Sequence, residues 1–415
     1  MPSTTSPTRR PGGILRPATM RDHDVHERPS TPLELLFDLC FVVAVAVLAA
    51  GLDHGIVDGH ALEASVTYVL LFVPIWWAWM SYTWYATAFS HDDALTRLLT
   101  LLQMAGVLAV AAAIPTAIDG DLLAFSLAYA AMRLPLIVQW LRSAHDDPAH
   151  RAFALTYAGG SALAQVGWVV GAVLPAPARA AVFSAALAVE LATPVLAVKR
   201  SPDRVFHPWH IAERYGLFTI IVLGETILAV SVGLRDVLDG DGGLGSAPAI
   251  VGAALVIAFG LWWIYFDALG RDALTRHRRA AFLWGYGHYV LFAAVAAVGA
   301  GVQAQLQLDA HGEVTDHVVS AAAVAMPVAV SLAAIAWLQQ AANGKVGDAV
   351  WLYLGAVVAC CALPLAGAWP VAAIDALLAV VVVALVVREL LSQRRITRGS
   401  SADRAAARRR PGAPR

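Results

Sequence analysis

RPSTPLELLFDLCFVVAVAV, from Arg28 to Val47, is the first long apolar run of this chain, and two carboxylates interrupt it near its start. Glu34 and Asp38 lie four residues apart, so a helix formed here carries both on one face. A second long apolar segment, HPWHIAERYGLFTIIVLGETILAV, contains three more charged residues: Glu213, Arg214 and Glu225. Both runs are long enough to cross a bilayer as helices. They predict two membrane spans with charged side chains inside them.

The composition of the whole chain is that of a membrane protein. Of its 415 residues, 59% are hydrophobic and only 14% are charged, and the mean hydropathy is +0.65. A soluble protein is about 25% charged, so most of this surface must face lipid. The three cysteines, Cys40, Cys360 and Cys361, lie in apolar runs without CxxC spacing. They predict neither a disulfide framework nor a zinc site.

Apolar runs of about 17 to 25 residues, the length that spans a bilayer as a helix, occur twelve times. Their approximate centres are Val42, Phe72, Met104, Tyr129, Leu163, Leu187, Ile221, Val256, Phe292, Ala325, Val358 and Val381. The segments before the first run and after the last are basic and poor in apolar residues, so we interpret both as disordered. No cleavable signal peptide is visible, and we expect the first span to direct insertion.

The positions of the basic residues predict the orientation, because cytoplasmic loops carry an excess of Lys and Arg. With a cytoplasmic N-terminus, all but four of the 29 basic residues fall in cytoplasmic segments; the exceptions are Arg133, Arg179, Arg214 and Arg235. The opposite loops are acidic, as in DHGIVDGH and RDVLDGDGG. We therefore expect a multi-pass protein of the cytoplasmic membrane with both termini in the cytoplasm.

An internal repeat is visible at an offset of 179 residues. DALTR occurs at Asp93–Arg97 and again at Asp272–Arg276, and the same offset carries Glu34 onto Glu213. Six spans per half give both halves the same orientation, a parallel repeat as in many secondary transporters. The expected organisation is a disordered basic cytoplasmic N-terminus, two six-helix repeats and a disordered Arg-rich cytoplasmic tail, at residues 1–28, 29–200, 201–395 and 396–415.

Glu34 has two interpretations. In Thr31-Pro32-Leu33-Glu34, Thr31 fits the N-cap and Pro32 the first helical position, with Glu34 reaching back as the partner of a capping box. A carboxylate there also complements the positive end of the helix dipole. The alternative is a direct functional role. Glu213, with His210 three residues before it, has the same two interpretations.

Asp38 and Glu225 lie deeper in their spans. Asp38 is beyond the reach of a cap, and a charge near the bilayer centre costs about 2.5–3.5 kcal/mol on insertion scales, so Asp38 must face the bundle interior. Glu225 follows Glu213 by 12 residues, about 18 Å along a helix, and Gly224 beside it leaves room for water or a close neighbour. Glu225 is therefore a candidate for proton exchange. Function and a structural ion pair both remain open for Asp38.

Two cations are candidate partners for these acids. Arg214 begins the seventh span, and it would pair with Glu34 or Asp38 if the first and seventh spans face each other across a pseudo-twofold axis. Arg133 lies within the fourth span, in AAMRLPL. Arg133 either pairs with one of these carboxylates or extends toward the cytoplasmic interface.

The aromatic run IWWAWMSYTWYATAF, residues 75–89, lies at the predicted cytoplasmic end of the second span. We interpret it as an interfacial belt, which is where Trp and Tyr gather in membrane proteins. A substrate-lining wall is the alternative.

Several motifs are absent from the sequence. It contains no phosphate-binding GxxxxGK[ST] loop, no HExxH and no clustered His and Cys. No polar segment is long enough for a catalytic domain. We therefore expect no enzyme activity, no cofactor, no metal and no nucleic-acid partner.

ELLFDLCFVVAVAV and HIAERYGLFTIIVLGETILAV resemble the two signature stretches of the bacterial low temperature requirement A (LtrA) family of membrane proteins. The resemblance extends from about Arg28 to Arg395. The first stretch keeps its Glu and Asp, and the second keeps its Glu-Arg and Gly-Glu. The resemblance implies an inner-membrane protein linked to growth in the cold, and it supplies no substrate.

We expect an all-α polytopic membrane protein with about twelve transmembrane helices in two parallel six-helix repeats. The leading hypothesis is secondary transport or ion permeation through intramembrane carboxylates, with the lipid bilayer and protons, or a small-molecule or ion substrate, as partners. The candidate functional residues are Asp38, Glu225, Glu34, Glu213, Arg214 and Arg133. The alternative is a non-transporting membrane protein that supports growth or envelope function at low temperature. A lipid-modifying enzyme is least favoured, because no nucleophile and base pair is visible.

Overall fold

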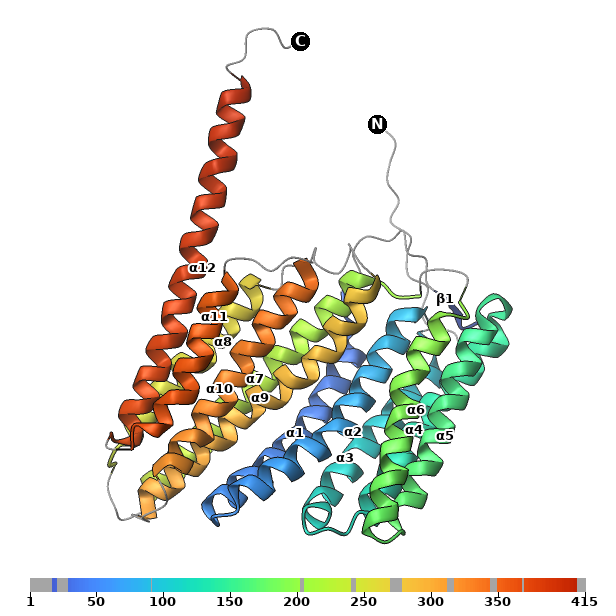
Figure 1. Cartoon of the computed structure of the whole chain (residues 1–415). Coiled ribbons are helices and arrows are strands. Elements are labelled where there is room, and N and C mark those ends of the chain that lie inside the picture. The colour runs from blue at the N-terminus through green and yellow to red at the C-terminus, as the bar shows by residue number, and fades with distance from the viewer. Residues whose placement is uncertain are drawn as a thin grey trace. The chain divides into compact units, whose positions relative to one another are not determined.

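The computed structural model describes residues 17–20, 29–90, 92–201, 205–239, 244–268, 278–311, 317–343, 349–367 and 369–408. Within these ranges twelve α-helices follow one another along the chain (Figure 1): α1 Pro32–Val57, α2 Ala61–Ala88, α3 Ala94–Ile118, α4 Leu123–Asp146, α5 Arg151–Ala172, α6 Ala176–Val198, α7 Pro208–Asp239, α8 Ala247–Ala268, α9 Arg278–His311, α10 His317–Asn343, α11 Ala349–Ala362 and α12 Val371–Arg408. Short 3-10 helices cover Pro148–His150 and Leu363–Leu365, and two-residue strands cover Thr19–Met20 (β1) and Phe89–Ser90 (β2).

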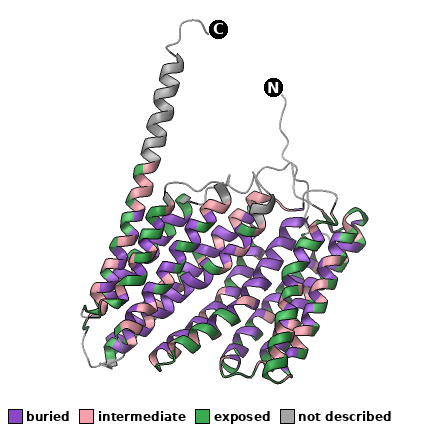
Figure 2. Cartoon of the chain, viewed as in Figure 1, coloured by how far each residue is buried: buried purple, intermediate pink, exposed green. Residues whose placement is uncertain are grey.

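The all-α polytopic membrane fold expected from hydropathy is confirmed. Each of the twelve predicted span centres falls inside one helix, and eleven helices in the described residues are long and apolar enough to cross a membrane. The exception is α11, which has 14 residues. Together with the 3-10 helix that follows it, α11 forms the shorter apolar helix Val350–Leu365. Figure 2 shows buried and exposed residues alternating along the same helices. The exposed ones include many large apolar side chains, such as Leu163 and Val166, as expected of surfaces that face lipid.

The chain divides into two compact units. The first comprises Met1–Leu48 and Leu70–Leu217, and the second comprises Ala49–Val69 and Phe218–Arg415. In the first unit α3 packs on α4, α4 on α5 and α5 on α6; in the second, α9 packs on α10, α10 on α11 and α8 on α12. These units do not follow the repeat boundaries that the sequence predicts, and the internal repeat stays a prediction. The second DALTR copy lies outside the described residues.

The N-terminal segment differs in part from the disorder predicted for residues 1–28. Strand β1 pairs antiparallel with β2, Thr19 opposite Ser90 and Met20 opposite Phe89. The backbone N–H of Ala18 donates to Asp146, and that of Met20 donates to Asp147, each at 2.9 Å. The carboxylates at the end of α4 thus accept hydrogen bonds from backbone N–H groups of this segment. Composition alone does not reveal such partners. Residues 1–16 and 21–28 lie outside the described part.

The C-terminal segment also differs from its prediction. Disorder was expected from residue 396, but α12 continues to Arg408. The extension is rich in Ala and Arg, which are strong helix formers, and it prolongs a helix that already exists, so it needs no new nucleus. Residues 409–415 lie outside the described part of the chain.

The contact between Asp147 and β1 should depend on pH. Burial raises the pKa of Asp147, but hydrogen bonds from the Met20 N–H and from His150 outweigh burial and lower the pKa below its usual value. A carboxylate with a lowered pKa stabilises the folded state above its unfolded pKa of about 3.9, and this contribution is lost as the pH falls through the folded pKa. In Asp147→Asn we expect the Met20 amide to exchange at least about tenfold faster at pH 7, as befits the loss of a charge-assisted bond.

Hydrogen exchange measured by mass spectrometry on peptides covering residues 17–20 would check this expectation. Asp92→Asn is the matched control, because Asp92 pairs with exposed Arg97 and does not bond to β1. The difference in melting temperature between wild type and Asp147→Asn should be present at pH 5–7 and shrink below about pH 4. Equal exchange rates in both proteins at pH 7 would contradict the proposed contact.

Candidate functional site

Buried polar side chains at four-residue spacing on three helices form a polar ladder in the first compact unit. Four-residue spacing places side chains on one face of a helix, one turn apart. All members are at most 3% exposed. The polar ladder consists of Glu34 and Asp38 on α1, Trp79, Thr83 and Thr87 on α2, and His210 and Arg214 on α7.

The first rung of the ladder is an ion pair between Asp38 and Arg214. Arg214 Nη2 donates to Asp38 Oδ1 at 2.7 Å, and Trp79 Nε1 donates to the same oxygen at 2.7 Å. The same Arg214 nitrogen lies 3.4 Å from Thr83 Oγ1. Both charged side chains are 0% exposed. The predicted pairing of the first and seventh spans is therefore confirmed, with Asp38 as the partner.

This ion pair is incompletely satisfied. Among the described residues, no hydrogen-bond partner meets Asp38 Oδ2, Arg214 Nε or Arg214 Nη1. Buried polar atoms are almost always paired, and an unpaired one costs about 1–3 kcal/mol, with more for charged groups. The rung therefore keeps one acceptor and several donors available for water, a proton or a ligand.

The second rung joins Glu34, His210 and Thr87. His210 Nε2 lies 3.4 Å from Glu34 Oε1, and His210 Nδ1 lies 2.8 Å from Thr87 Oγ1. The Thr87 hydroxyl donates its single proton to the Thr83 carbonyl, at 2.8 Å. His210 Nδ1 must therefore be the donor toward Thr87. Nε2 then faces a carboxylate, which is favourable only when a proton sits between them. The contact is an ion pair when His210 is protonated.

Glu34 forms the predicted capping box, and the alternative of a direct functional role stays a prediction. Its Oε2 accepts from the Thr31 N–H at 2.6 Å and from Thr31 Oγ1 at 2.8 Å, while the Glu34 N–H lies 3.3 Å from Thr31 Oγ1. This reciprocal arrangement is the predicted capping box. The other carboxylate oxygen faces His210 in the ladder. One residue therefore caps α1 and also belongs to the second rung.

Glu213 does not cap its own helix, and that interpretation is wrong. Helix α7 begins at Pro208, in keeping with the preference of Pro for the first helical position, so Glu213 lies in the second turn. Its Oε1 instead accepts the N–H of Ser30 at 3.1 Å, just before α1. Glu213 therefore ties α7 to the beginning of α1, beside the ladder.

Arg133 lies in a separate buried cluster of α4, α5 and α6. It is 2% exposed, so the alternative that it extends to the interface is wrong. It interacts electrostatically with Glu190 on α6. Gln165 donates to Glu190 at 2.9 Å and Tyr129 at 3.4 Å. Arg133 itself makes no hydrogen bond to a described residue, and its Nε and Nη1 are buried.

Glu225 belongs to the second compact unit. It is half-buried and makes no hydrogen bond or ion pair within the part of the chain that the structure describes. A Cβ atom added to Gly224 would meet nothing within 4 Å, so the expected open space beside Glu225 is present. Of the six predicted residues, the ladder brings together Asp38, Glu34 and Arg214.

Sequence reasoning missed four members of the ladder: Trp79, Thr83, Thr87 and His210. The available signal was spacing, because HxxxR on α7 mirrors ExxxD on α1. The aromatic run was interpreted as an interfacial belt, yet Trp79 is 0% and Trp84 2% exposed. Trp84 Nε1 donates to Tyr215 OH at 3.1 Å, and Trp79 packs edge-on against the Tyr215 ring at 4.8 Å. Trp79 and Trp84 thus both contact Tyr215, which follows Arg214 on α7. Within the described residues, no three His, Cys, Asp or Glu side chains gather as a metal site.

Comparison with known proteins shows that the chain matches a protein family over most of its length. The profile of the family described as bacterial low temperature requirement A protein (LtrA) matches residues 29–387, which include every member of the ladder. The chain is also similar to an uncharacterized protein of Rhizobium meliloti (strain 1021), with 28% identity over 284 residues, covering 65% of this chain and 68% of that relative. A match over this extent shows membership: the chain belongs to the bacterial low temperature requirement A protein family.

Proposed function

We propose that this protein is a secondary transporter or ion-permeation protein in which the polar ladder carries protons. The observation that supports the proposal is the fully buried, half-satisfied pair of Asp38 and Arg214. Ionisable residues inside membrane spans are rare because burying them is costly, and they mark ion and substrate pathways. A purely structural pair would be expected to satisfy its remaining donors and acceptors.

Thr83 and Thr87 bring the two rungs of the ladder close to each other. His210 contacts Thr87, Thr87 donates to the Thr83 backbone, and Arg214 reaches Thr83 Oγ1 before it meets Asp38. A proton that leaves the Glu34–His210 rung and reaches Asp38 would neutralise that carboxylate. Arg214 would then lose its counter-ion and become available to an anionic group. Proton movement and anion binding are thereby linked through one guanidinium.

The proposal includes the cytoplasmic membrane as the location, with both termini in the cytoplasm, on the support of the basic residues along the chain. It includes no enzyme activity. The partners are the lipid bilayer and either protons alone or protons with a small-molecule or ion substrate.

Proton flux into proteoliposomes tests the proposal. With a potassium diffusion potential and an internal pH dye, we expect wild-type flux and at least about a tenfold loss in Asp38→Asn, because the amide cannot accept and release a proton. Asp119→Asn is the matched control, since Asp119 is an exposed loop acid beside α3, and it should retain wild-type flux. Monodisperse gel filtration of each protein shows that it is folded. Absence of flux in the wild type, or full flux in a folded Asp38→Asn protein, would refute the proposal.

A second candidate function is a non-transporting membrane protein that supports growth or envelope function at low temperature. The observation in its favour is that three contacts join the start of α1 to α7: Asp38 with Arg214, Glu34 with His210, and Ser30 with Glu213. Such contacts serve a purely structural role equally well. This candidate is favoured if neutral replacement of both Asp38 and Arg214 preserves growth in the cold.

A further inference from the structure

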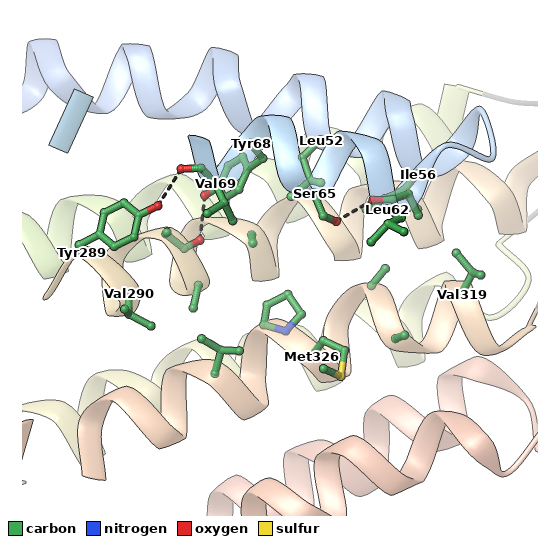
Figure 3. A pocket seen from close by; sticks show the side chains of 18 residues that line it. Leu52, Ile56, Leu62, Ser65, Tyr68, Val69, Tyr289, Val290, Val319 and Met326 are labelled. Atoms are coloured by element: carbon green, nitrogen blue, oxygen red, sulfur yellow. Dashed lines mark hydrogen bonds between the residues drawn. The ribbon is translucent and has the colours of Figure 1, made fainter. Parts of the chain in front are cut away.

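A cavity of about 600 Å³ lies within the second compact unit, between the α1–α2 turn and helices α9 and α10 (Figure 3). Leu52 and Ile56 come from the end of α1, and the first three turns of α2 supply a second wall. Tyr289 to Ala297 of α9 and Val319 to Val330 of α10 form the rest of the lining. The volume is within the range of about 300–1,000 Å³ that is usual for small-molecule sites. None of these residues belongs to the polar ladder.

The lining is apolar, and its few polar groups are already bonded. Its only residues with hydroxyl groups are Ser65, Tyr68 and Tyr289, and no lining residue is charged. Ser65 donates to the Ala61 carbonyl at 2.7 Å, Tyr68 to the Ala293 carbonyl at 2.8 Å, and Tyr289 to the Val69 carbonyl at 2.7 Å. Figure 3 shows these bonds along the α2 wall. Because the hydroxyl protons are used, an occupant gains little from polar groups of its own.

The cavity extends along its helices. Ile56 lies next to the last residue of α1, Leu62 is the second residue of α2 and Val319 the third of α10, so one end of the lining lies at the ends of these three helices. Tyr289 and Val330 lie at the other end of the lining. On α10, Val319 and Val330 are eleven positions apart, about 16 Å at 1.5 Å per residue. One leaflet of a bilayer has a hydrocarbon depth of about 15 Å, half of the usual 30 Å.

The cavity opens onto the surface of the membrane spans. Leu62 is 81% exposed, Val69 47% and Met326 44%, and all three lie in helices that are long and apolar enough to cross a membrane. The surroundings of these helices are lipid, so the cavity is continuous with the lipid-facing surface. A hydrocarbon chain of the adjoining leaflet can therefore enter it from the side.

We propose that this cavity is a binding site for one acyl chain of a membrane phospholipid. Its length matches one leaflet, it opens onto the lipid-facing surface, and its bonded hydroxyls leave hydrocarbon as the complementary surface. An acyl chain bound here touches α1, α2, α9 and α10 at once. It therefore bridges the α1–α2 turn and the α9–α10 pair. The site is independent of the proposed transport function.

Photolabelling of the full chain in lipid nanodiscs tests this site. Two phosphatidylcholine probes are used, one with a diazirine near the methyl end of an acyl chain and one with a diazirine near the glycerol. After irradiation and digestion, mass spectrometry maps the adducts. The deep probe should label peptides around Tyr289 and Val330, and the shallow probe should label those around Leu62 and Val319. Excess unlabelled phosphatidylcholine should compete with both probes and reduce both signals.

A space-filling variant and a matched control separate a built site from ordinary lipid contact. Ala322 lines the cavity, so Ala322→Phe should reduce deep labelling at least fivefold. Ala362 lines a different apolar groove of the same unit, and Ala362→Phe should leave that labelling unchanged. If Ala322→Phe fails gel filtration, Met326→Trp replaces it, because the exposed Met326 side chain tolerates a larger substituent better than a core position does.

Three results would overturn the proposal. The first is adducts spread equally over all lipid-facing helices, and the second is the same adduct positions for both probes. Each of these indicates unspecific annular lipid. The third is labelling that a small apolar solute such as decane displaces but unlabelled phosphatidylcholine does not. This result would assign the cavity to a different ligand.

Discussion

Asp38→Asn is expected to lower the free energy of unfolding by about 3–5 kcal/mol, because it leaves Arg214 charged, buried and without its counter-ion. The Arg214 guanidinium is 0% exposed and donates directly to Asp38, so solvent cannot replace the lost carboxylate. The Trp79 indole N–H loses the charged acceptor of its hydrogen bond as well. The measurement is thermal and chemical unfolding of the purified protein in detergent, followed by circular dichroism.

The double variant Asp38→Asn/Arg214→Gln isolates the ion pair. Removing both charges eliminates the buried unpaired cation, so we expect the double variant to recover most of the lost stability. Asp92→Asn serves as the control, because the Asp92–Arg97 pair is exposed and such pairs are worth about 0–1 kcal/mol. Purely additive losses in the double variant would contradict the pairing.

The same double variant separates the two candidate functions. A structural pair can be replaced by neutral residues once folding is restored, so flux or growth should return together with stability. A functional pair cannot, because the proton acceptor and the anion-binding guanidinium are both gone. Restored stability with absent proton flux is the result that the transport proposal predicts.

Gly301→Ala is expected to destabilise the second compact unit by about 3 kcal/mol, at the upper end of the usual cost of overpacking. A Cβ atom at Gly301 on α9 would lie 2.0 Å from the carbonyl oxygen of Ala323 and 2.6 Å from its carbonyl carbon, on α10. These are backbone atoms, so no side-chain rotation relieves the clash and the two helices must separate. Small residues permit such close helix approach inside membranes.

Gly355→Ala is the matched control for this prediction. Gly355 lies in the interior of α11, where an added Cβ meets nothing within 4 Å. Alanine is also the better helix former by about 1 kcal/mol, so Gly355→Ala should be neutral or stabilising. Melting temperatures measured side by side in detergent check both variants. Equal melting temperatures for Gly301→Ala and the wild type would show that the α9–α10 contact is looser than the structure has it.

The sequence by itself determined the helices and their number. Each of the twelve apolar runs lies in one helix of the described residues, because a backbone in lipid must satisfy its own hydrogen bonds and a helix does so within one segment. Local chemistry was equally readable: Thr31, Pro32 and Glu34 predicted the capping box from their spacing alone. The spacing of Glu34 and Asp38 also predicted that both lie on one face.

Only the tertiary structure decided which side chains meet. Arg214 had two expected partners and takes Asp38, while His210 and Thr87 join Glu34, and Glu213 reaches Ser30. In a soluble helix an apolar stripe would have indicated the inward face. In lipid nearly every face of a span is apolar, so hydropathy does not tell which face packs against which helix. The partners of the buried charges therefore depend on helix packing, which the pattern of apolar residues leaves open.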